Sequence, residues 1–244
     1  MSAAGYDVAK LSELIDHFDH LPEPAFNRLL EVLGTPSICE LPEDQRVLLW
    51  DHLNKFTNKH RRFSDAKWAL KDDSISRIEQ IAEELAPTNP FNLHQYLFSD
   101  QDFDLYEEND NWEEQQRKID ERREKAIVEI FKQNGIDGVI QFAESVVSAI
   151  QVGYALGAIA DDLIELTLLP VFLDTKDAKH RDLVRGFIWK RYHINGWSWC
   201  DKLEKSGWTP PQLGCFLVCL PFNKETWNHA SEWLNENQGE YWSR

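Results

Sequence analysis

The chain has 244 residues, of which 42% are hydrophobic and 28% charged, and its formal net charge is −16 at pH 7. This length can bury a sizeable core, in one large domain or two small ones. The negative charge disfavours general binding to nucleic-acid phosphates, although a local basic patch can override a global average. No stretch has the ~18 apolar residues of a membrane helix, and no signal-peptide pattern is visible. We therefore expect a cytoplasmic protein that does not bind membranes.

Apolar residues recur at three- and four-residue intervals through most of the first hundred positions, and this spacing predicts amphipathic helices. Pro24 suits the first turn of a helix, where its missing N–H costs nothing, and Gly34 suits a helix end. Pro42 can begin another helix, and Asp73 or Ser74 can cap a fourth. Helices are thus expected over residues 6–20, 25–34, 43–63 and 74–85, with a loop over 35–42.

A run of acidic residues, SDQDFDLYEENDNWEE, interrupts this pattern near the middle of the chain. Its carboxylates repel one another and its apolar residues show no periodicity, which is typical of a surface loop. The predicted organisation is an N-terminal helical lobe over residues 1–98, an acidic loop over 99–111 and a C-terminal helical-repeat lobe over 112–244.

The second half begins with a polar helix that Gly135 is expected to end. The clearest period in the chain then predicts one helix over residues 136–150. An apolar stretch over 153–173 follows, with Pro170 bending or ending it. Asp174 or Thr175 is expected to cap the helix over 177–194.

Two segments about 51 positions apart share an order of features. ELTLLPVFLDTKDAKHRDLV and CFLVCLPFNKETWNHASEWL each contain an apolar helix, a Leu-Pro pair, a short polar turn and an amphipathic helix. Such hairpins are the units of α-solenoids, and no strict alternation predicts a strand. The expected fold is all-α, with helical hairpins stacked as an irregular α-solenoid or a two-lobed helical bundle.

Motifs of known chemistry are missing from the sequence. It contains no phosphate loop, dinucleotide fingerprint, nucleophile elbow or HExxH motif. Asp161 and Asp162 are adjacent, so on a helix they diverge by about 100° and cannot easily share a proton; charge at a helix amino terminus explains them more simply. The four cysteines are expected to be free thiols. We expect no catalytic residues and no cofactor.

Two alternatives to a non-catalytic protein remain open. In the segment DHFDH, His17 and His20 lie three residues apart with acids beside them, a spacing that could hold a metal ion for a small metal-dependent hydrolase. Helical His and acid pairs are also ordinary solvated surface. The basic residues from Lys55 to Lys71 could bind nucleic acid, but charge at a helix carboxyl end explains the cluster as well.

Seven of the ten tryptophans lie in the last quarter of the chain. Core packing explains most of them, yet tryptophan is also frequent at binding hot spots. Trp197 and Trp199 are one residue apart and must point in different directions on a helix. Trp208 precedes the helix entry Thr209-Pro210-Pro211, and Trp242 is almost the last residue. We take Trp197, Trp199, Trp208 and Trp242 as candidate partner-binding residues.

The segments HRRFSDAKWAL, GWSWCDKLEKSG, LPFNKETW and EYW resemble the helical-repeat carboxyl regions of large bacterial multidomain proteins, including antiphage-defence NTPases of the STAND type. The resemblance implies that the chain senses a partner or holds a scaffold, while catalytic domains lie elsewhere. We therefore expect a non-catalytic interaction module that is a segment of a larger protein. Its partner is expected to be a protein, from phage or from other domains of the same polypeptide.

Overall fold

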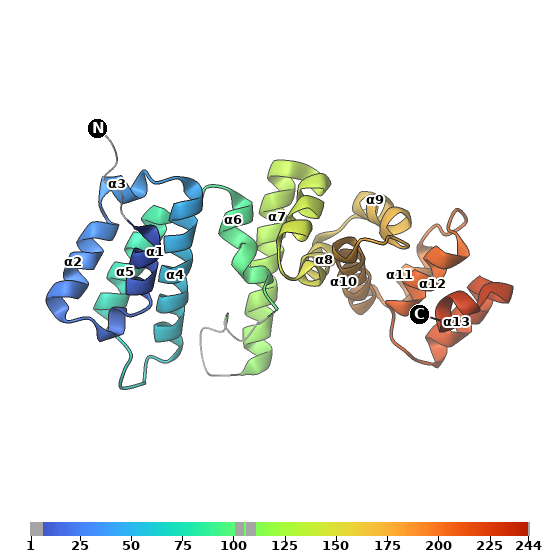
Figure 1. Cartoon of the computed structure of the whole chain (residues 1–244). Coiled ribbons are helices and arrows are strands. Elements are labelled where there is room, and N and C mark those ends of the chain that lie inside the picture. The colour runs from blue at the N-terminus through green and yellow to red at the C-terminus, as the bar shows by residue number, and fades with distance from the viewer. Residues whose placement is uncertain (1–6, 101–104, 106–110, 244) are drawn as a thin grey trace. The chain divides into compact units, whose positions relative to one another are not determined.

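The structure is a computed structural model that describes residues 7–100, 105 and 111–243 (Figure 1). These residues form fourteen α-helices, α1 to α14, and short 3-10 turns, with no strand among them. The predicted all-α fold class is confirmed. No helix in the described ranges has the length and apolar character to cross a bilayer. The expected acidic loop over 99–111 falls mostly outside the described residues and stays a prediction.

The chain divides into two compact units, and the first runs to Leu97 and includes the start of α7 as far as Ile119. In this unit α4 packs against α1 and α5, and α2 packs against α5. The core side chains come from the apolar faces expected from the sequence, with Leu49 and Leu53 of α4 fully buried. The helices of this unit that precede α7 are α1 (Val8–Ile15), α2 (Glu23–Leu33), α3 (Pro36–Cys39), α4 (Glu43–Arg62), α5 (Asp72–Leu85) and α6 (Pro90–His94).

The predicted loop over 35–42 is wrong, because α3 forms a single helical turn there. Its amino end follows Thr35, whose carbonyl accepts hydrogen bonds from the N–H groups of Ile38 and Cys39. Ile38 is fully buried, so tertiary packing holds a turn that the local composition marks as a connection. The expected cap at Asp73 or Ser74 is also wrong, since α5 begins at Asp72 and both aspartates lie in its first turn.

The second unit comprises residues 98–100 and the chain from Asp120 onward. The helices that form it, apart from the first residues of α7, are α7 (Trp112–Ser145), α8 (Ala149–Ile159), α9 (Asp162–Phe172), α10 (Ala178–Asn195), α11 (Trp197–Lys202), α12 (Pro210–Val218), α13 (Lys224–Leu234) and α14 (Gly239–Trp242). Gly135 interrupts α7 with φ 67° and ψ −165°. That conformation strongly favours glycine, and the predicted break at Gly135 is confirmed.

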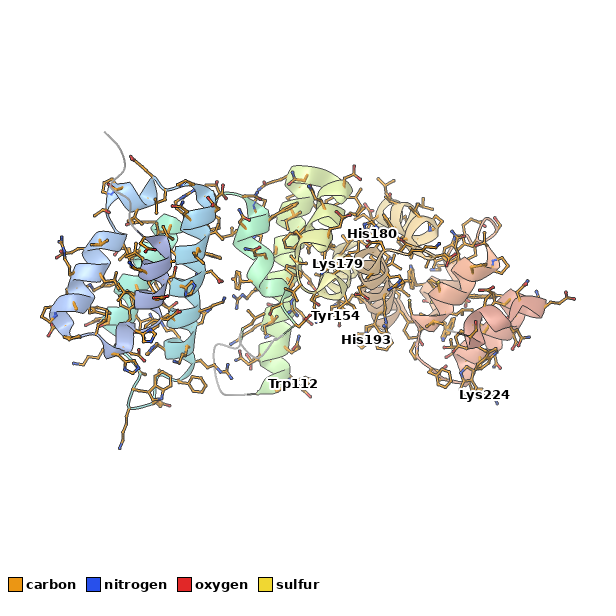
Figure 2. The ribbon with its side chains drawn as sticks, viewed as in Figure 1. Trp112, Tyr154, Lys179, His180, His193 and Lys224 are labelled. Carbon is orange, nitrogen blue, oxygen red and sulfur yellow. The ribbon has the colours of Figure 1, made fainter. Side chains whose placement is uncertain are left out.

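The single helix predicted over 136–150 is wrong beyond Ser145, where α7 ends before α8 begins at Ala149. The end of α7 is held from α10: the Lys179 ammonium donates hydrogen bonds to the carbonyls of Val146 and Val147, at 2.5 and 2.8 Å. Lys179 and its neighbour His180 are labelled in Figure 2. A cation at the carboxyl end of a helix satisfies free carbonyls and the helix dipole, so a contact from a distant helix sets this break.

Helices α8 and α10 make the closest packing in the second unit. Glycines allow it: a Cβ built on Gly153 would lie 1.8 Å from the Leu183 carbonyl oxygen, and one on Gly186 would lie 2.0 Å from the Ile150 carbonyl oxygen. Either distance is far below van der Waals contact, so the two backbones approach as only glycine permits. Helix α10 also contacts α9 and α11.

The amino ends of the next helices are set by aspartates. Asp161 caps α9, its carboxylate accepting the Ile164 N–H at 3.0 Å, which agrees with the expected helix-terminal role. Asp177 caps α10 and accepts the His180 N–H at 2.9 Å; the expected caps at Asp174 or Thr175 are therefore wrong. The echoed hairpins correspond to α9–α10 and α12–α13, but Pro170 lies within α9 whereas its counterpart follows α12.

Candidate functional site

Trp197, one of the candidate partner-binding residues, is half-buried in an aromatic stack. Its ring lies 3.9 Å from that of His229, with an interplanar angle of 27°, and 6.1 Å from that of Trp233. His229 and Trp233 belong to α13 and Trp197 begins α11, so the stack joins these two helices. In the structure, Trp197 therefore packs against other side chains of the same protein.

Trp199 is buried, with 6% of its surface exposed. Its indole N–H donates a hydrogen bond of 2.9 Å to the Glu165 carboxylate, and the same carboxylate forms an ion pair with Arg191. The guanidinium also lies 5.8 Å from the centre of the Trp199 ring. Because both charged side chains are largely shielded, the ion pair and the indole N–H together fix the relative positions of α9, α10 and α11.

This polar cluster opens onto a pocket of about 770 Å³. Trp199 and Trp208 both line it, and both rings pack on Phe216, at 5.9 and 5.4 Å between ring centres. The remaining lining residues come from α9, α10, α11 and the loop before α12: Asp162, Glu165, Leu166, Leu169, Pro170, Arg191, Asn195, Ser198, Lys202, Leu203, Glu204, Ser206 and Gly207. The pocket therefore brings together two of the four tryptophans singled out from the sequence, but not Trp197 or Trp242.

The loop that closes one side of the pocket is held at both ends. Lys205 donates hydrogen bonds to the carbonyls of Cys200 and Leu203, and its ammonium lies 4.5 Å from the centre of the Trp233 ring. At the other end Thr209 and Gln212 form a capping box at the start of α12, which is the helix entry expected there. The position of Trp208 is thus set by the chain on either side of it.

A second aromatic surface surrounds Trp242, which is 52% exposed. Phe222 is 75% exposed and Trp227 37%, and the three ring centres lie 5.1 to 6.5 Å apart. We call these three side chains the aromatic patch. Phe222 precedes by two residues Lys224, which begins α13 and is labelled in Figure 2. Trp242 was a candidate from the sequence, whereas the solvent exposure of Phe222 and Trp227 emerges only from the fold.

The cysteines are free thiols, as expected. Burial raises the pKa of Cys200 to about 12 and that of Cys219 to about 12. A thiol is a nucleophile only as thiolate, so these two side chains are protonated and unreactive near neutral pH. Cys200 serves as a small apolar group in the packing of α11, and the Cys219 thiol donates a hydrogen bond to the Cys215 carbonyl just after α12.

The geometry around His17 and His20 gives no support to the metal-dependent alternative. The His17 Nδ1 atom lies 2.9 Å from the Glu13 carbonyl oxygen, within one turn of helix, and the rings of His17 and His20 lie 6.3 Å apart. Across the part of the chain that the structure describes, no three His, Cys, Asp or Glu side chains converge as metal ligands would. The metal-dependent alternative therefore stays a prediction without a ligand cluster among the described residues.

Two of the basic residues considered for nucleic-acid binding, Lys55 and Arg61, are paired with acids of the same unit. Lys55 forms an ion pair with Asp51 at 2.6 Å, and Arg61 bonds Glu79 at 2.7 and 2.9 Å. Lys59 lies over the Trp68 ring at 5.2 Å. The ion pairs compensate the charges of Lys55 and Arg61, which favours the structural explanation for these two residues.

Comparison of the chain with protein-family models, with curated proteins and with solved structures found no match in any of the three. The resemblance to repeat regions of bacterial defence proteins therefore stays a prediction.

Proposed function

We propose that the chain is an α-helical protein-interaction module that binds a partner protein through the aromatic patch. The observation that carries this proposal is the exposure of Phe222, Trp227 and Trp242, whose rings contact one another on the surface of one unit. Single exposed apolar residues are ordinary, but clustered aromatic residues mark binding surfaces.

The side chains of the aromatic patch are also held in place by the fold. Tyr241 is 5% exposed, and its ring lies 4.8 Å from that of Trp242, so a buried residue supports an exposed one. Trp227 lies at the first turn of α13, where its N–H donates a hydrogen bond to the Asn223 carbonyl. Aromatic side chains lose little conformational entropy on binding, and a preformed cluster of them loses less still.

The test is quantitative affinity capture from lysate of the source organism, followed by identification of the bound proteins. The variant Phe222→Ser with Trp242→Ser is expected to lose the specific partner. Val147→Ser is the control, since Val147 is also strongly exposed but lies outside the patch. Equal capture by all three proteins would show that the aromatic patch does not bind the partner.

The narrower form of the proposal is that the module senses a phage protein within a bacterial defence protein. It rests on the sequence resemblance alone. It predicts a P-loop NTPase domain in the same polypeptide, which sequencing of the coding region on both sides of these 244 codons would detect.

A further inference from the structure

Helix α9 carries apolar side chains on its outer side as well as on its inner one. Ile164 and Leu168 face the core and are buried, yet Leu163 is 72% exposed and Leu166 is 66% exposed. Local helix formation does not require leucine at either position, because polar residues serve as well on a solvated face. An exposed apolar strip of this kind on a helix marks a surface that another molecule covers.

This strip continues into the pocket described above. Leu166 belongs to both, and Leu169 and Pro170, from the next turn, line the pocket beside it. The volume of about 770 Å³ lies within the range of pockets that bury a ligand larger than one side chain. Its indole wall is held in place by the hydrogen bond from Trp199 to Glu165, so little ordering is needed on binding.

The charged residues that line the pocket indicate which charge a ligand should carry beside its apolar part. The charge of Arg191 is compensated by Glu165. Of the other charged lining residues, Asp162 and Glu204 are acidic and Lys202 is basic. Two acidic groups against one basic group leave the lining negative, and the chain as a whole carries a net charge of −16. Both charges favour a basic partner, because complementary charge speeds encounter and suppresses wrong partners.

We propose that this pocket and the adjoining leucines dock a short segment of a partner protein, with one large apolar side chain as anchor and lysine or arginine on either side. The anchor lies against Leu166 and the indoles of Trp199 and Trp208, and the basic flanks face Asp162 and Glu204. None of these residues belongs to the aromatic patch, so the inference stands independently of the proposed function.

Synthetic nine-residue peptides test the ligand chemistry. The probe has a central tryptophan between lysine-rich flanks, and its two controls replace the tryptophan by alanine or the lysines by glutamates. Titration of the full chain by calorimetry is expected to show saturable binding of the first peptide. Alanine at the centre should weaken binding at least about tenfold, as the loss of a buried large apolar side chain implies. Equal affinity for all three peptides, or no binding at millimolar concentration, would overturn the proposal.

The chain offers a matched pair of variants to locate the site. Leu166 and Val171 lie on the same helix and are 66% and 65% exposed, but only Leu166 lines the pocket. Leu166→Ser should weaken binding of the tryptophan peptide at least about fivefold, and Val171→Ser should leave it within twofold. Both variants are expected to keep the circular dichroism spectrum of the parent. Equal losses in the two would refute docking at the pocket.

A third variant separates this inference from the proposed function. Phe222→Ser with Trp242→Ser alters the aromatic patch only, so it should bind the tryptophan peptide as the parent does. Loss of peptide binding in this variant would place the peptide on the patch and overturn the assignment to the pocket. Binding of free indole without binding of any peptide would equally overturn it, because the pocket would then hold a small molecule.

Discussion

The substitution Gly153→Ala probes the closest helix contact in the protein. The added Cβ would lie 1.8 Å from the Leu183 carbonyl oxygen and 2.9 Å from the Phe187 nitrogen, both backbone atoms of α10. Real Cβ atoms essentially never come within 3.0 Å of such atoms. A backbone cannot rotate away as a side chain can, so α8 and α10 would have to separate by more than about 1 Å.

The size of the effect follows from two opposing terms. Forcing extra volume into a packed interior costs about 1–3 kcal/mol, and the upper end applies because the obstruction is backbone. Alanine is favoured over glycine within a helix by about 1 kcal/mol. We therefore expect Gly153→Ala to lower the free energy of unfolding by about 2 kcal/mol.

Urea unfolding followed by circular dichroism and tryptophan fluorescence measures this loss, with the slope of the transition as a check that the unfolded state is unchanged. Gly239→Ala is the control, because nothing lies within 4 Å of a Cβ at that position; it should change stability by less than about 0.5 kcal/mol. If Gly153→Ala unfolds at the same urea concentration as the parent, α8 and α10 do not pack as closely as described.

Two further predictions concern buried charge. Glu165→Gln leaves Arg191 without its counter-charge and should cost about 3 kcal/mol of stability in urea unfolding, whereas adding Arg191→Met should recover most of the loss; no recovery would argue against the ion pair. Burial lowers the pKa of His60 below its usual 6.5, with Asp19 opposing this and Lys59 adding to it. Protonation of His60 therefore favours the unfolded chain, so its contribution to stability should be constant above about pH 6.5 and fall as the pH drops from there towards the folded-state pKa. In the variant His60→Gln, the urea midpoint of unfolding should change less between pH 8 and pH 5.5 than it does in the parent. An equal pH dependence in the two proteins would show that His60 is not its cause.

Local chemistry predicted most helices and some of their ends. The break at Gly135 and the start of α12 at Thr209-Pro210-Pro211 depend on residues within one turn of the position concerned. The helical turn at Ile38 and the break after Ser145 depend instead on burial and on Lys179, 34 residues farther along the chain. Periodicity does not register such contacts, which explains why both were predicted wrongly.

The same division holds for the candidate site. The all-α fold and the choice of Trp199 and Trp208 could be predicted from the sequence, because helical spacing and aromatic content are local properties. The burial of Trp199 against Glu165 and Arg191 could not be predicted, because these residues are 34 and 8 positions away in the chain. The exposure of Leu166 likewise depends on how the helices pack. Periodicity identifies the apolar side chains of a helix, but which of them are covered depends on the helices that pack there.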